Sequence, residues 1–330
     1  MTTVTGEPGT PSADATADEA GTAPGDRRFR PDVEGLRAVA VLLVVLHHAN
    51  LPGLSGGFVG VDVFFVISGF VITGLLLRER ASTDHTSLRS FYGRRVRRIL
   101  PAATVVIVTM VIATYAVLGA VYGDPTAVAA RWTAVFLANF HFAGIGTDYL
   151  TATVPPSPLQ NFWSLAVEEQ FYLVYPAIFL VAASVRSRMS IRARLTVVLV
   201  PIILASLLVS AIQTGTSPNV AFFSPVTRAW ELALGALVAV ATPTLLRMHR
   251  TVAGALTWVG MAAIGYAAFA YSSSTSYPGT AVIVPVVGTA LVIAGGSAVP
   301  ARAAESILRL PPFQWVGRLS YSLYLWHCPS

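Results

Sequence analysis

The sequence predicts an all-α integral membrane protein, a helical bundle with about ten membrane-embedded helices. Its 330 residues are 54% hydrophobic and only 12% charged, whereas soluble domains carry about 25% charged residues. Apolar stretches long enough to cross a hydrocarbon core of about 30 Å recur along the chain. Short arginine clusters lie between them, as in the cytoplasmic loops of membrane proteins. These observations exclude a soluble domain with a single core.

Several kinds of partner are not expected. All 22 basic residues are arginine, and they form no basic face interleaved with aromatic residues, so we expect no nucleic acid partner despite a net charge of +6. Cys328 is the only cysteine, which rules out an internal disulfide or a cysteine metal cluster. The histidines do not have the spacing of a ligand set, so no metal site is predicted.

Two regions are expected along the chain. Residues 1–28 are rich in Ala, Thr, Gly, Pro and acidic residues, which predicts a disordered cytoplasmic tail rather than a signal peptide. Residues 29–330 form the transmembrane domain. The last apolar stretch reaches Ser330 without a polar flank, so we expect this domain to be truncated at its C-terminus.

The membrane helices are read from apolar stretches separated by Gly, Pro, Ser and Arg residues. A last helix begins near residue 316 and is cut off by the end of the chain. The others are expected at 33–50, 58–77, 99–121, 161–184, 195–213, 227–244, 253–271 and 279–297.

The stretch 131–146 is apolar but short, and Asp124 and Asp148 flank it. Every arginine cluster falls on the cytoplasmic side only if this stretch does not cross the membrane. We therefore expect it to be a re-entrant or interfacial helix. The same topology gives a cytoplasmic N-terminus and places the loop 122–160 outside.

Ionisable residues inside membrane spans cost about 2.5–3.5 kcal/mol each at the helix centre, so they are functional candidates. The predicted topology brings several of them to one layer near the outer leaflet. Ion pairs that hold helices together are the alternative for any one residue, but convergence of the set at one depth favours a site. These residues are His47, His48, Asp62, Glu168, Glu169, Arg228 and Glu231.

A second layer, on the cytoplasmic side, contains Arg37, Arg95 and Arg98. Arginines at this depth are also what the positive-inside rule predicts, but their planar guanidinium groups suit a phosphorylated ligand. Arg37 and His48 are eleven residues apart and therefore share one helix face, about 16 Å apart along the axis. Histidine is a suitable general base, and a buried carboxylate such as Glu168 would fix its tautomer.

Six blocks in order make the chain resemble the membrane acyltransferase family 3, which includes bacterial O-acetylases of lipopolysaccharide and peptidoglycan. The resemblance covers residues 29–330. The blocks read FRPDVEGLRAVAVLLVVLHHA, GGFVGVDVFFVISGFVIT, FYGRRVRRILPA, NFWSLAVEEQFYLVYP, SPVTRAWELALGAL and RLSYSLYLWH. Cys328 stands where family members usually have a second tryptophan, which we interpret as a packing change.

The resemblance implies roles for particular residues. His48 is the general base, Arg95 and Arg98 form an RxxR pair on the acyl-CoA side together with Arg37, and Glu168 is a further catalytic candidate. Asp62 is a catalytic candidate from its place in the outer layer of ionisable residues. The remaining site candidates are Ser164, Glu169, Arg228, Glu231 and His327.

The expected function is therefore O-acyl transfer, most simply acetyl transfer, from cytoplasmic acyl-CoA to a hydroxyl of an envelope or secreted carbohydrate. The enzyme would span the bacterial cytoplasmic membrane in contact with its lipid. Relatives that share the sequence SPLQNFWSLAVEEQFY often continue into an extracytoplasmic SGNH-type domain. The rival is a transporter or exporter of a small anionic or glycosidic molecule. Its buried Glu, His and Arg residues would form a proton relay, but such a carrier has no evident use for an RxxR pair.

Overall fold

The structure is a computed structural model that describes residues 30–147, 149, 156–298 and 303–327. The residues from Pro31 onward form one compact unit, and within the described ranges every regular element is a helix. The expected tail at 1–28 and Cys328 lie outside the described residues.

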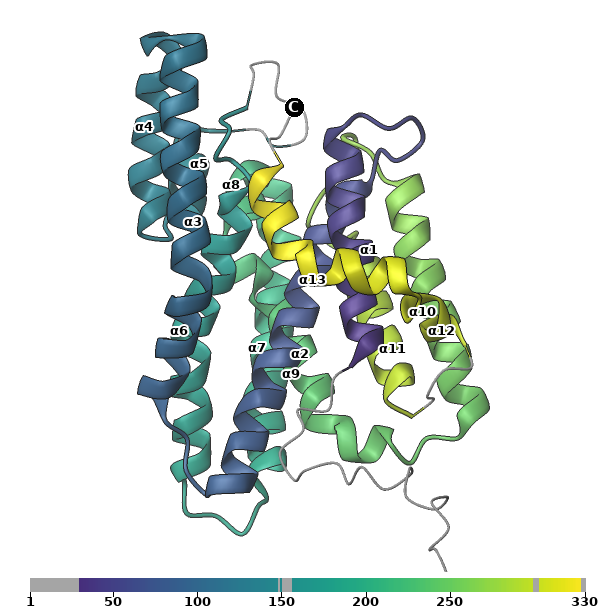
Figure 1. Cartoon of the computed structure of the whole chain (residues 1–330). Coiled ribbons are helices and arrows are strands. Elements are labelled where there is room, and N and C mark those ends of the chain that lie inside the picture. The colour runs from purple at the N-terminus through teal and green to yellow at the C-terminus, as the bar shows by residue number, and fades with distance from the viewer. Residues whose placement is uncertain (1–29, 148, 150–155, 299–302, 328–330) are drawn as a thin grey trace, which may run out of the picture. The chain divides into compact units, whose positions relative to one another are not determined.

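The chain folds into a series of antiparallel helices with short connections (Figure 1). Several begin at serine caps, because the hydroxyl oxygens of Ser87, Ser190 and Ser224 accept hydrogen bonds from free amides of the first turn. The elements are α1 (Pro31–His48), the 3-10 turn η1 (Gly57–Val59), α2 (Gly60–Thr83), α3 (Leu88–Leu118), α4 (Ala120–Ala134), α5 (Ala138–Gly144), α6 (Phe162–Ser184), α7 (Ile191–Thr216), α8 (Pro218–Phe223), α9 (Pro225–Leu245), α10 (Arg250–Ala270), α11 (Ile283–Ala298), α12 (Ala304–Leu308) and α13 (Pro311–Trp326).

Six helical stretches of the described chain are long and apolar enough to cross a membrane. This confirms the all-α, multi-pass membrane fold, whereas the expected number of about ten embedded helices is not confirmed. The six stretches are Gly57–Thr83, Leu88–Leu118, Phe162–Ser184, Ile191–Thr216, Pro218–Leu245 and Arg250–Ala270.

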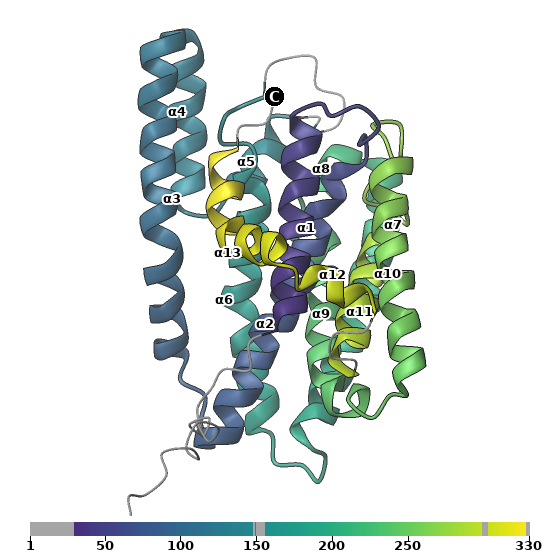
Figure 2. The same ribbon diagram turned by 45° about the vertical axis from the view of Figure 1, so that its right-hand side comes forward.

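The region between α3 and α6 differs from the expected single helix over 131–146. α3 ends at Leu118, and Gly119, with φ of +73°, turns the chain into α4, which lies alongside α3 in both views (Figures 1 and 2). The chain then breaks at Phe136, whose φ is +55°, before the short α5 begins. A local left-handed backbone leaves no trace in apolar periodicity, so the sequence reading fused the end of α4 with α5.

Helices α2 and α9 pack with their backbones in contact. A Cβ atom on Gly69 would lie 1.8 Å from the Leu232 carbonyl oxygen, and one on Gly235 would lie 1.9 Å from that of Val66. Each glycine thus admits the backbone of the other helix, a mode of packing common in membranes. This close contact fixes the positions of the polar side chains that both helices carry.

The turns α2–α3, α6–α7 and α9–α10 lie at one end of the bundle, at the bottom of both views, and His48 ends α1 at the other (Figures 1 and 2). The final helix, α13, differs from the expected last span. It crosses α1 obliquely at mid-height rather than running alongside it, and it packs against α1 through Gly317, where a Cβ would lie 2.2 Å from the Glu34 carbonyl oxygen.

Candidate active site

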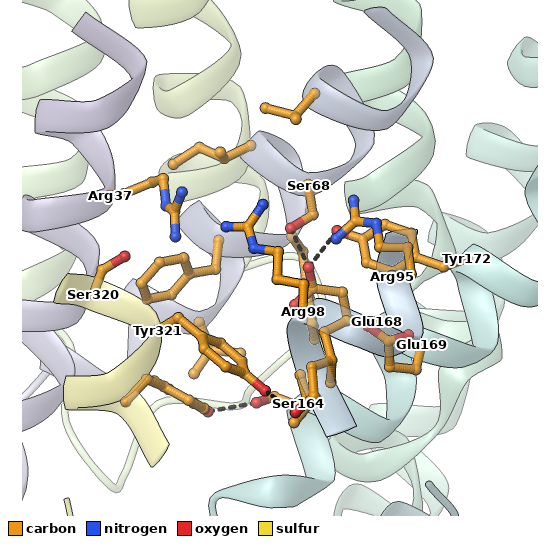
Figure 3. A pocket seen from close by; sticks show the side chains of 18 residues that line it. Arg37, Ser68, Arg95, Arg98, Ser164, Glu168, Glu169, Tyr172, Ser320 and Tyr321 are labelled. Atoms are coloured by element: carbon orange, nitrogen blue, oxygen red, sulfur yellow. Dashed lines mark hydrogen bonds between the residues drawn. The ribbon is translucent and has the colours of Figure 1, made fainter. Parts of the chain in front are cut away.

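A cavity of about 110 Å³ lies where α1, α2, α3, α6 and α13 meet (Figure 3). Most of the sequence-predicted polar residues of these helices line it, and we call it the arginine cavity. Its polar lining consists of Arg37, Ser68, Arg95, Arg98, Ser164, Glu168, Glu169, Tyr172, Ser320, Tyr321 and Tyr324.

The three arginines of this cavity come from α1 and α3 (Figure 3). The Arg95 guanidinium lies 4.1 Å from the centroid of the Tyr172 ring, a cation–π contact. Within the described chain neither Arg95 nor Arg98 makes an ion pair, and Arg37 has only a 3.7 Å contact with Glu34. The cavity therefore presents guanidinium groups with unused hydrogen-bond donors, as an anionic ligand requires.

The carboxylates of α6 occupy this same cavity, not the layer of His48 in which we expected them. One carboxylate oxygen of Glu168 accepts hydrogen bonds from Ser68 Oγ, at 2.6 Å, and from the Tyr172 hydroxyl. An oxygen of the neighbouring Glu169 is buried and has no hydrogen-bond partner among the described residues. The expectation that Glu168 fixes the tautomer of His48 is wrong.

His48 belongs to a second site at the end of α1. Its Nδ1 donates to the carbonyl oxygen of Val44, at 2.8 Å, so this backbone acceptor fixes the tautomer. In the neutral ring Nε2 is then an acceptor, and the Tyr149 hydroxyl lies 3.1 Å from it. The rings of His47 and His327 flank His48, with centroids 5.4 Å and 5.1 Å away.

Tyr149 is a residue of this site that sequence reasoning missed. It lies between α5 and α6, and its ring stacks on Phe222 with centroids 4.6 Å apart. Burial raises the pKa of the Tyr149 hydroxyl above its ordinary value, so the phenol stays protonated at neutral pH and donates to His48. A lone tyrosine in a long loop carries no periodic signal that would have identified it.

The C-terminal end of α13 separates the arginine cavity from the histidines. The Tyr324 hydroxyl forms a hydrogen bond with Ser164 Oγ at the cavity wall. The ring of Tyr324 is centred 5.0 Å from that of His327, whose Nδ1 donates to the Tyr324 carbonyl oxygen at 2.6 Å. Tyr324 and His327 thus connect the wall of the arginine cavity with His48.

Asp62, Arg228 and Glu231 form a separate, fully buried cluster. Arg228 Nη1 donates to Asp62 Oδ1 at 2.8 Å and to Glu231 Oε1 at 3.1 Å, and the Tyr277 hydroxyl donates to the other Asp62 oxygen. These side chains do not line the arginine cavity. The geometry corresponds to an ion cluster that joins α2 and α9, the alternative weighed above, rather than to a catalytic role for Asp62.

A metal centre has no ligand set here, because the described residues include no group of three or more His, Cys, Asp or Glu side chains placed to hold an ion.

The sequence matches the acyltransferase domain family over residues 30–329. It is 32% identical over 321 residues to peptidoglycan O-acetyltransferase OatA of Listeria monocytogenes, which covers 92% of this chain and 49% of the relative. It is 32% identical to the putative peptidoglycan O-acetyltransferase YrhL of Bacillus subtilis (92% and 48% covered) and 31% identical to O-acetyltransferase OatA of Staphylococcus aureus (92% and 50% covered).

The chain spans about half the length of these curated relatives. No solved structure matches it. The match to nearly the whole described chain, over the same blocks that supply the arginine cavity and His48, identifies the protein as a member of the membrane acyltransferase family 3.

Proposed function

We propose that the protein is a membrane-bound O-acetyltransferase that moves an acetyl group from cytoplasmic acetyl-CoA to a hydroxyl of a cell-wall carbohydrate. One observation carries this proposal: a cavity lined by three arginines is linked through Tyr324 and His327 to a histidine, His48, whose Nε2 faces a hydroxyl group. The transporter alternative does not account for family membership.

The arginine cavity is the donor site in this proposal. Its volume of about 110 Å³ is below the range of sites that enclose a drug-sized ligand, so the cavity would receive the thioester end of acetyl-CoA. Arg98 is exposed and Arg95 is half-buried. The pantetheine and its phosphates would extend from the cavity past these guanidinium groups.

His48 is the general base for the acceptor. The Tyr149 hydroxyl marks where an acceptor hydroxyl would be activated, 3.1 Å from Nε2. In a direct transfer, the acceptor gives its proton to Nε2 while its oxygen bonds to the acyl carbon. The carbon–sulfur bond then breaks, and the proton leaves with the thiol of CoA. The Nδ1–Val44 bond favours this, because the imidazolium that forms keeps a backbone oxygen next to its other N–H.

The orientation in the membrane follows from the arginine-bearing turns. Arg186 and Arg188 in the α6–α7 turn and Arg247 in the α9–α10 turn would lie in the cytoplasm, with the N-terminus and the donor site accessible from that side. His48 then lies toward the outside of a bacterial cytoplasmic membrane, where the carbohydrate is. The additional length of the relatives is consistent with an SGNH-type partner domain.

Mass spectrometry of cell-wall fragments tests the proposal. The full-length protein is expressed in a host that lacks O-acetylated wall glycan, beside the His48→Ala variant at a matched membrane level. We expect a mass increment of one acetyl group on muropeptides with the wild type and none with the variant. An increment that persists in His48→Ala contradicts the base assignment, and no increment in either strain contradicts the proposed activity.

A further inference from the structure

A second cavity, of about 300 Å³, lies beside the arginine cavity between α3 and α6. Its walls are apolar apart from a few side chains, with Phe91, Val96 and Leu100 on α3 and Leu173 on α6. We call it the lateral cleft. Helices α3 and α4 stand beside α6 in Figure 2, so the cleft lies in the outer wall of the bundle.

Hydrogen bonds hold the lateral cleft at both of its ends. Toward the α2–α3 turn, the Tyr92 hydroxyl donates to the Leu173 carbonyl oxygen at 2.8 Å, linking α3 to α6. Toward the other end, Gln170 Nε2 donates to the Phe136 carbonyl oxygen at 2.8 Å and to Asn139 Oδ1 at 2.9 Å. The first bond ties α3 to α6 beside the cleft, and the other two tie α6 to α5 and to the segment before it.

The cleft connects a polar inner end with an apolar outer lip. Arg95, Glu169 and Tyr172 line both cavities, so the inner end of the cleft is the wall of the arginine cavity. At the outer lip, Val96 is 51% exposed and Leu173 is 66% exposed, both on helices that have the length and hydropathy of membrane spans. The lip therefore lies on the outer surface of these two helices.

We propose that the lateral cleft receives the acyl chain of a donor thioester longer than acetyl and lets it project toward the bilayer. The inference rests on the proposed donor site in the arginine cavity. A thioester is polar at its carbonyl and apolar along its chain, which matches a guanidinium-lined inner end and an apolar outer end. The volume of about 300 Å³ leaves room for an acyl chain beside the arginine cavity.

The affinity for the donor should then depend on the length of its acyl chain. Each methylene group that leaves water for an apolar wall tightens binding about fourfold. Butyryl-CoA has two more methylene groups than acetyl-CoA, so we expect it to bind about fifteenfold more tightly. Without a role for the cleft, no such gain is expected.

Competition binding on the full-length protein in lipid nanodiscs tests this. Acetyl-CoA, butyryl-CoA and octanoyl-CoA are compared on the wild type and on two variants that fill the lip, Val96→Trp and Leu173→Trp. The matched control is Leu204→Trp, which adds the same side chain at an exposed position of α7 outside both cavities. We expect the ratio of butyryl-CoA to acetyl-CoA affinity to fall at least fivefold in the lip variants and to stay constant in the control.

The outcomes separate the two proposals. If the wild type binds acetyl-CoA but rejects butyryl-CoA, or if the lip variants weaken both donors equally, the role of the cleft is wrong and the donor site stands. If butyryl-CoA binds only after delipidation in detergent, a bilayer lipid fills the cleft and the inference fails. If no acyl-CoA binds to the wild type, the proposed donor site fails and the inference with it.

Discussion

The imidazole rings of His48 and His327 lie with their centroids 5.1 Å apart, and both rings are oriented in the same way by backbone oxygens. Nδ1 of His48 donates to the Val44 carbonyl oxygen, and Nδ1 of His327 donates to that of Tyr324. In both neutral rings Nε2 is therefore the acceptor nitrogen, and Nε2 of His48 faces the Tyr149 hydroxyl. Nε2 of His327 is buried and has no hydrogen-bond partner among the described residues, so an acceptor hydroxyl held near His48 would have a second nitrogen to bind.

The first prediction concerns His48 itself. Its replacement by Gln keeps a polar side chain of similar length but removes the base, so we expect the rate of acetyl transfer to fall about 10²–10⁴-fold. The affinity for acetyl-CoA should change less than twofold, because the arginine cavity is separate from His48. Transfer is measured by mass spectrometry and affinity by competition binding. A large loss of donor affinity would show that His48 acts on the donor and not on the acceptor.

The second prediction separates binding from packing at His327. His327→Phe preserves an aromatic ring against Tyr324 and His48 but lacks the free nitrogen. The loss of one hydrogen bond to the acceptor, worth about 1 kcal/mol, should raise the acceptor KM about fivefold and leave kcat within twofold.

The control for His327→Phe is His327→Ala, which removes both the aromatic ring and the free nitrogen. Added imidazole should restore transfer by His327→Ala and have no effect on His327→Phe. If His327→Phe retains the wild-type acceptor KM, the ring of His327 serves packing alone.

Much of the fold was predictable because apolar length and arginine clustering are direct consequences of a bilayer. The helix that carries Arg37 and His48 was placed at 33–50 and is found at Pro31–His48. The division of the charged residues into two layers failed at Glu168 for a geometric reason. The third span was expected to begin at residue 99, whereas α3 begins at Leu88. Arg95 and Arg98 therefore lie two to three turns inside the helix, where they line the same cavity as Glu168.

Two parts of the site were beyond sequence reasoning. The approach of Tyr149 to His48 depends on a loop whose path no local pattern encodes. The oblique path of α13, which brings His327 to His48, depends on its packing against α1 through Gly317 rather than on its own apolar periodicity. Long-range packing of this kind is set by the whole bundle, so a single segment does not reveal it.

The third prediction tests the arginine cavity with neighbours on one helix. Arg98 lines the cavity, and Arg97, the adjacent residue, is exposed and does not. A hydrogen bond to a charged group is worth about 1.5–3 kcal/mol, so Arg98→Gln should raise the KM for acetyl-CoA by more than about tenfold. Arg97→Gln should change it less than twofold. Equal effects of the two substitutions would mean that only the general positive charge of this helix matters.

The fourth prediction concerns the buried ion cluster. Asp62 and Glu231 share one guanidinium, that of Arg228, and an uncompensated buried charge is strongly unfavourable. One proton shared by the two carboxyl groups makes the cluster neutral. In Glu231→Gln the side chain at 231 is always uncharged, and Asp62 alone balances Arg228. We therefore expect the free energy of unfolding in detergent to stay within about 1 kcal/mol of the wild type.

Its counterpart is Asp62→Asn. This change places an amide between the Arg228 guanidinium and the Tyr277 hydroxyl, which both donate to Asp62. The NH2 group of the amide cannot accept the hydrogen bond that one carboxylate oxygen accepts, so one buried donor loses its partner and we expect a loss of about 1–3 kcal/mol. Both variants are compared by thermal unfolding of the purified protein. A more severe effect of Glu231→Gln than of Asp62→Asn would mean that Glu231 is the charged carboxylate.

The fifth prediction concerns the contact between α2 and α9 on which this cluster depends. A Cβ on Gly69 would lie 1.8 Å from the Leu232 carbonyl oxygen, far inside van der Waals contact, and the obstacle is backbone rather than a flexible side chain. Gly69→Ala should therefore force the helices apart and destabilise the fold by about 1–3 kcal/mol or more.

Gly265→Ala is the matched control, because it adds the same methyl group to α10 at a position with no heavy atom within 4 Å of the new Cβ. Alanine also favours helix over glycine, so this variant should be as stable as the wild type or slightly more stable. Separation of α2 from α9 would also move Asp62 away from Arg228. Gly69→Ala should therefore lose more stability in a wild-type background than in an Asp62→Asn background, where that ion pair is already absent. Equal losses in the two backgrounds would mean that the glycine contact and the ion cluster are independent.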